Sequence, residues 1–120
     1  MTSGRLTTHV LDIARGQPAA DVPIELWRCH PNDDRQLLVA TRTNADGRTD
    51  APLLAAGRMA AGTYELVFTV AAYFAADASD ITAVPFLDRI PIRFAISDPT
   101  AHYHVPLLVT PWAYSTYRGS

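Results

Sequence analysis

The stretch His102-Tyr-His-Val-Pro-Leu-Leu-Val-Thr-Pro-Trp-Ala-Tyr-Ser-Thr-Tyr-Arg-Gly-Ser120 carries most of the information in this chain of 120 residues. It begins as a strand, in which alternate side chains share one face, so His102 and His104 point to the same side and apolar neighbours point to the other. Pro111 interrupts the strand because it has no N–H to donate. A second short strand is predicted over 112–117. The stretch therefore predicts a strand pair with two histidines on one face.

The same alternation of apolar and polar residues recurs along the rest of the chain, with turn-forming residues about every ten residues. One helix is predicted over 71–78, which is rich in Ala and free of β-branched residues. This pattern favours an all-β fold, an antiparallel β-sandwich, with residues 1–120 as one domain. The remaining predicted strands are 6–13, 22–29, 37–43, 49–54 (short), 63–70 and 90–96.

Composition excludes several classes of function. The net charge of −2 gives no electrostatic case for binding nucleic acid or an anionic membrane. All ten basic residues are Arg, so a Schiff-base lysine is excluded. Cys29 is the one cysteine, so no intrachain disulfide can form, and no apolar run approaches the roughly 18 residues of a membrane helix. No secretory signal is recognised, and a cytoplasmic location is expected.

Three polar features of the predicted strands and turns are candidates for chemistry. His9 lies within a strand, where a histidine more often has a structural role. His102 and His104 with His9 would supply three zinc ligands, although no cysteine or acidic residue stands near the pair. Arg48 follows an Asp-Gly turn, where an arginine is usually solvated. These residues alone indicate no more than an antiparallel β domain with a candidate His/Arg site.

Four separate motifs resemble the 5-hydroxyisourate hydrolase family, the transthyretin-related enzymes of urate breakdown. The resemblance covers essentially the whole chain, and the terminal Tyr-Arg-Gly-Ser is its most specific mark. True transthyretins share a stretch corresponding to 110–116 but lack this tetrapeptide and the histidines. The motifs are Leu6-Thr-Thr-His-Val-Leu-Asp12, Gly47-Arg-Thr-Asp50, Val84-Pro-Phe-Leu-Asp88 and the stretch that ends at Ser120.

The resemblance implies a transthyretin-like sandwich of two four-stranded sheets with one short helix. It implies a homotetramer, a dimer of dimers, whose active sites lie in the channel between dimers. The implied reaction is hydrolysis of a ring amide of 5-hydroxyisourate to 2-oxo-4-hydroxy-4-carboxy-5-ureidoimidazoline. No metal or cofactor is expected.

The resemblance also assigns the site, and His102 is left out of it. The expected catalytic residues are His9, Arg48, His104 and Ser120, and the expected substrate-binding residues are His9, Arg48, Tyr117, Arg118 and Gly119. The histidines would activate water and transfer protons, and the arginine would offset charge developing on the substrate. Two alternatives stay open: a small-molecule carrier without catalysis, and a zinc-dependent hydrolase.

Overall fold

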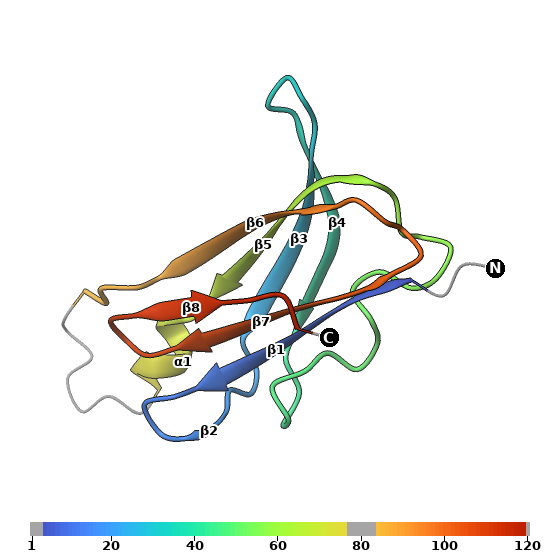
Figure 1. Cartoon of the computed structure of the whole chain (residues 1–120). Helices are drawn as coiled ribbons and strands as arrows, with labels where there is room; N and C mark the ends of the chain where they lie inside the picture. The colour runs from blue at the N-terminus through green and yellow to red at the C-terminus, as the bar shows by residue number, and fades with distance from the viewer. Residues whose placement is uncertain (1–3, 77–83, 120) are drawn as a thin grey trace.

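The computed structural model describes residues 4–76 and 84–119, which form two stacked β-sheets with one short helix beside them (Figure 1). The helix, in yellow-green, lies near the end of the molecule that is opposite the N-terminus. No helix among the described residues is long and apolar enough to cross a bilayer. The elements are β1 (Arg5–Asp12), β2 (Gln17–Pro18), β3 (Pro23–Cys29), β4 (Arg35–Arg42), β5 (Gly62–Thr69), α1 (Ala71–Ala75), β6 (Arg89–Ile96), β7 (His102–Val109) and β8 (Tyr114–Thr116).

The strands divide equally between the sheets. One sheet has the order β2-β1-β7-β8 and the other has the order β4-β3-β5-β6. This confirms the two four-stranded sheets and the short helix that the resemblance implied. Because β1 and β7 are the central strands of the first sheet, the two histidine-bearing segments lie side by side.

The core lies between the inner faces of the two sheets. β1 alternates as its sequence predicts: Leu6 and Val10 are fully buried, in the same apolar cluster as Leu66 and Phe68 of β5. Burying one such side chain stabilises the fold by about 1.5–3 kcal/mol. Burial of the inner face therefore sets the orientation of each strand, and the intervening residues of β1 and β7 must face outward.

One strand pair departs from the antiparallel prediction. β1 and β7 run parallel, with Arg5 opposite His102 and Thr7 opposite His104. A parallel pair needs a long crossover connection, and here the connection contains the whole of the other sheet. The alternation of residues within a strand carries no information on the direction of its partner, so it could not indicate this distant parallel pair.

Some local boundaries also differ from the predictions. Residues 49–54 form no strand, and only Leu54 makes an isolated bridge, with Leu6. The two-residue strand β2 is not among the predicted strands. Of the helix predicted over 71–78, α1 ends at Ala75, and 77–78 lie outside the described residues. Cys29 is a partly buried free thiol.

Candidate active site

A threonine and two histidines meet on the outer face of the β2-β1-β7-β8 sheet. The alternate residues of β1 and β7 are buried inside the sandwich, so Thr7, His102 and His104 face outward, and the parallel register brings them together. Thr7 Oγ1 is 2.8 Å from His102 Nε2 and 2.8 Å from His104 Nδ1. The two imidazoles are therefore joined through one hydroxyl.

Arg48 reaches this face through a tight turn that docks on β1. The Asn44 side-chain oxygen accepts the backbone N–H groups of Asp46 (2.9 Å) and Arg48 (3.2 Å), which closes the turn. Gly47 has φ +76°, and a Cβ there would lie 2.4 Å from the Val10 carbonyl oxygen. The Val10 N–H donates to the Gly47 carbonyl (2.8 Å), so the turn that ends at Arg48 is held against the strand.

His9 is attached to the same turn. Its Nε2 is 2.7 Å from the Asp46 carbonyl oxygen. A carbonyl only accepts, so Nε2 carries the proton in this contact and a neutral His9 has its lone pair on Nδ1. The contact links the first candidate histidine to the segment that presents Arg48.

An open cleft of about 440 Å³ lies over Thr7 and the two β7 histidines. Neither guanidinium in its lining has an ion pair or hydrogen bond with another described residue, and Asp50 instead accepts a hydrogen bond from Asn44 (3.0 Å). The cleft thus presents unpaired cations beside imidazoles. Its lining residues are Arg5, Thr7, Thr8, Arg48, Thr49, Asp50, Ala51, Pro52, His102 and His104.

The electrostatic surroundings keep both β7 imidazoles neutral. Partial burial lowers the pKa of His104 below its ordinary value of 6.5, the Arg48 guanidinium lowers it further, and His102 and His9 do so whenever they are protonated. Burial and the charge of Arg5 also lower the pKa of His102. At neutral pH His104 therefore has a lone pair available to accept a proton.

The C-terminal segment packs beside His104. The Gly119 N–H donates to the His104 carbonyl (2.7 Å), and a Cβ on Gly119 would lie 2.6 Å from the His104 ring. The Arg118 guanidinium lies 4.1 Å from the centre of the Tyr103 ring and donates to the His102 carbonyl at 3.5 Å. These contacts hold the segment on β7, and a glycine at 119 leaves room for the imidazole.

The predicted site residues are only partly brought together. Arg48 and His104 line the cleft, and His9 adjoins it through the shared turn. Tyr117 and Arg118 line a different cavity at the edge of the sandwich, and Tyr117 is 59% exposed. Ser120 lies outside the described residues.

The three-histidine zinc site is not formed. Across residues 4–76 and 84–119, no three His, Cys, Asp or Glu side chains gather closely enough to hold a metal ion. His102 is instead hydrogen-bonded to Thr7, and His9 to the Asp46 carbonyl.

Sequence reasoning missed Arg5, Thr7 and His102 as parts of the cleft. The strand period gave a partial signal, because Thr7 shares a face with His9 and His102 shares one with His104. The register of β1 against β7, which joins these faces across about 95 residues of sequence, was not predictable from either strand alone.

Comparison with known proteins identifies the family. A family profile described as HIUase/Transthyretin family matches residues 6–119. This chain belongs to the HIUase/Transthyretin family. The match spans both sheets and every described residue of the cleft except Arg5.

Members of the HIUase/Transthyretin family with named activities align over nearly the whole chain. The 5-hydroxyisourate hydrolase of Halalkalibacterium halodurans is 53% identical over 118 residues, covering 98% of this chain and 99% of the relative. A solved 5-hydroxyisourate hydrolase of Klebsiella pneumoniae has a TM-score of 0.78 at 37% identity and covers 100% of both chains. A solved (S)-allantoin synthase has a TM-score of 0.91 at 46% identity, covering 99% of this chain and 44% of that chain.

Proposed function

We propose that this protein hydrolyses 5-hydroxyisourate to 2-oxo-4-hydroxy-4-carboxy-5-ureidoimidazoline in urate degradation. The observation that carries the proposal is the meeting, in one open cleft, of a neutral His104 and an Arg48 with no carboxylate partner among the described residues. The hydrolase relatives that align over nearly the whole chain support it.

The reaction needs an activated water and a group that offsets the charge of a tetrahedral oxyanion. His104 serves as general base because its pKa lies below neutrality and its lone pair is free at pH 7. The Arg48 guanidinium donates to substrate oxygens and stabilises the oxyanion as it forms. His9 contributes positive potential to His104 and a second proton-transfer group at the edge of the cleft.

The C-terminal segment would bind and orient the substrate ring. Tyr117 presents an exposed phenol, and Gly119 and Arg118 hold the segment against β7 beside His104. We assign Ser120 to the same segment from the family resemblance. The substrate ring is flat and rich in oxygen, so it suits a cleft with several hydrogen-bond donors.

We also propose that the protein is a cytoplasmic homotetramer of single-domain subunits. Large apolar side chains are exposed at one end of the β2-β1-β7-β8 sheet, where Ile13 is 52% and Trp112 73% exposed, as expected for surfaces covered by another copy. β6 and β8 are edge strands with unpaired backbone groups that a second copy can pair. Neighbouring subunits would then bring Tyr117 into each other's clefts.

The test is to generate 5-hydroxyisourate in situ with a uricase and to follow its ultraviolet signal with and without the protein. Faster decay, with the ring-opened product formed, supports the hydrolase. Decay at the spontaneous rate contradicts it. A slower decay that tracks protein concentration would instead indicate the carrier alternative, in which the ligand is bound without turnover.

A further inference from the structure

The hydroxyl of Thr7 has a single hydrogen but contacts two imidazole nitrogens. His102 Nε2 and His104 Nδ1 each lie 2.8 Å from Thr7 Oγ1, and the ring centres are 6.3 Å apart. The hydroxyl can donate to one ring only, so the other ring must donate its own N–H to Thr7. The protonation of the two histidines is therefore coupled through this one side chain.

Two arrangements satisfy both hydrogen bonds with the hydroxyl hydrogen placed between the rings; in a third, both rings donate to the Thr7 oxygen and that hydrogen points away from them. In the first, His104 Nδ1–H donates to Thr7 and Thr7 donates to His102 Nε2, which leaves the His104 Nε2 lone pair free as a base. In the second, His102 Nε2–H donates to Thr7 and Thr7 donates to His104 Nδ1, which leaves His104 Nε2–H ready as an acid. Hydrolysis of an amide needs both forms in turn, a base for the water and an acid for the leaving nitrogen.

We propose that Thr7 and His102 form a proton relay behind His104, which converts it from general base to general acid within one turnover. Thr7 and His102 are positioning residues, because they act through His104 and not on the substrate. The relay's part in hydrolysis rests on the proposed function, whereas the coupling of the two histidines does not.

The relay conserves every proton. As water attacks the substrate carbonyl carbon, its proton passes to His104 Nε2. The Nδ1 proton moves to Thr7 Oγ1, and the Thr7 proton moves to His102 Nε2, which becomes the cation. When the C–N bond breaks, the Nε2 proton of His104 goes to the leaving nitrogen and the other two transfers reverse.

The surroundings fit a relay whose cation is transient. Arg5 from β1 and Arg48 from the 44–50 turn place positive charge near His102 and His104. His9 on β1 adds positive charge near His104 when it is protonated. Asp50 is the carboxylate in the cleft lining. Arg118 donates to the His102 backbone carbonyl, so it also faces this end of β7. The resting imidazoles stay neutral, and the positive charge moves away from the substrate and Arg48 when His102 accepts the proton.

The first test reads the tautomer of His104 directly and needs no substrate. In the wild type at neutral pH, ¹⁵N NMR should show a proton on His104 Nδ1 and none on Nε2. Thr7→Val removes the hydroxyl at nearly constant shape and should shift His104 toward the Nε2–H form, whereas Thr7→Ser should restore the wild-type signal. A wild-type His104 protonated on Nε2, or a Thr7→Val spectrum unchanged at His104, overturns the relay.

The second test is kinetic. Thr7→Val should lower kcat by about 10², the usual range of proton-transfer help, with KM little changed. His102→Gln can still accept a hydrogen bond from Thr7 but cannot accept a proton, so it should lower kcat similarly. The double variant should be no slower than either single variant, because all three interrupt one pathway. Losses that multiply in the double variant contradict the proposal.

A matched control separates the relay from general structural damage. Thr69→Val makes the same substitution on β5, away from the cleft, and should leave kcat and melting temperature unchanged. Thr7→Ser should keep most of the wild-type kcat and its pH profile. A wild type that fails to hydrolyse 5-hydroxyisourate would overturn the proposed function, while the tautomer measurement would still decide whether the histidines are coupled.

Discussion

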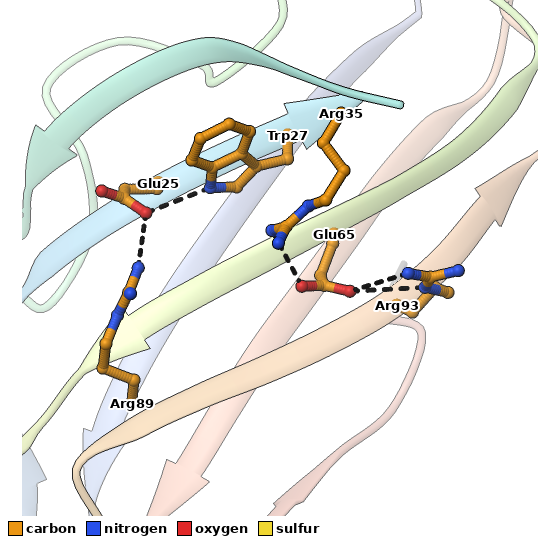
Figure 2. A network of polar contacts seen from close by, with 6 residues as sticks. All are labelled: Glu25, Trp27, Arg35, Glu65, Arg89 and Arg93. Carbon is orange, nitrogen blue, oxygen red and sulfur yellow. Dashed lines mark hydrogen bonds and ion pairs between the residues drawn. The ribbon is translucent and has the colours of Figure 1, made fainter. Parts of the chain in front are cut away.

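The two outer faces of the sandwich carry the same kinds of charged residue in opposite arrangements. On the β4-β3-β5-β6 sheet every guanidinium in Figure 2 has a carboxylate partner. Arg89 pairs with Glu25 at 2.7 Å, and Glu65 takes Arg35 at 3.1 Å and Arg93 at 3.3 Å. These guanidinium groups are therefore neutralised by carboxylates on other strands of the same sheet.

The network of Figure 2 continues through an aromatic ring. The Trp27 indole N–H donates to Glu25 (3.0 Å), and the Arg35 guanidinium lies 4.6 Å from the centre of the Trp27 ring. Cross-strand pairs of this kind stabilise a sheet without needing a ligand. The charged groups shown in Figure 2 therefore have partners within the sheet and do not need a ligand.

On the outer face formed by β1 and β7, the arginines are not paired with carboxylates of the described residues. Within the described part of the chain, Arg5 and Arg48 have no carboxylate partner, and they border a cleft that is also lined by two imidazoles of lowered pKa. An arginine without a counter-ion raises local positive potential and remains available to an anionic or oxygen-rich ligand. The pairing of the charges, and not their number, distinguishes the candidate active face from the structural one.

The largest expected effect comes from removing the cleft arginine. Arg48→Gln should lower kcat/KM by about 10²–10³, as loss of a group that stabilises an oxyanion usually does. The melting temperature should stay the same, because this guanidinium has no partner among the described residues. Arg89→Gln on the opposite face, whose guanidinium pairs with Glu25, is the matched control and should keep full activity. Equal losses in both variants would remove the distinction between the faces.

A smaller effect should follow from adding one methyl group beside His104. Gly119→Ala places a Cβ 2.6 Å from the His104 ring, so the ring must move. We expect kcat to fall by about tenfold or more, since a small misplacement of a catalytic group can cost up to roughly 10².

Gly16→Ala is the contrast for this substitution. Gly16 has φ +69° and open space around it, so alanine there strains the backbone and meets no side chain. It should cost about 1 kcal/mol of stability, measured by urea unfolding, and leave kcat unchanged. A Gly119→Ala variant with wild-type kcat would argue against the proposed catalytic role of the His104 imidazole beside this segment.

The pH dependence follows from the lowered pKa of His104. Since the neutral form is the base, kcat/KM should hold as pH falls to about 6.5 and decline as pH passes through the lowered pKa. Below about 6.5 the unfolded chain binds more protons at this group than the folded chain does, so stability should also fall as pH decreases through this window. His104→Gln should weaken that pH dependence of stability. A rate that begins to fall above pH 7 would contradict the assignment.

The smallest effect should come from the network of Figure 2. Glu65→Gln leaves two largely exposed arginines unpaired, whose side chains are 41% and 59% exposed, so the loss of stability should be about 0.5–1 kcal/mol. Raising salt to 1 M should shrink the difference from wild type, and activity should not change. A marked loss of 5-hydroxyisourate hydrolysis in this variant would mean that the β4-β3-β5-β6 sheet influences catalysis in the cleft.

Much of the fold was predictable because its signal is local. Strands were predicted over 6–13 and 63–70 from alternation, and in the structure Leu6 and Val10 of the first and Leu66 and Phe68 of the second are buried. Turn residues such as Gly47 marked where strands end. The parallel pairing of β1 with β7 was not predictable in this way, because nothing within either strand specifies a partner about 95 residues distant.

The site was predictable only in part, for the same reason. Motif resemblance assigned Arg48 and His104 to the expected site, and both line the cleft. Thr7 carries no unusual signal on its own strand, and His102 looked like a less characteristic neighbour of His104. Their importance comes from the register that places one hydroxyl between two imidazoles.

The most direct test of the account compares two histidines in one assay. The decay of 5-hydroxyisourate should be followed with wild type, His104→Ala and His30→Ala, the last being an exposed loop histidine outside the cleft. We predict rapid decay with wild type and His30→Ala and near-spontaneous decay with His104→Ala. Wild-type rates in His104→Ala, with the protein still folded, would contradict the assignment of this cleft as the active site.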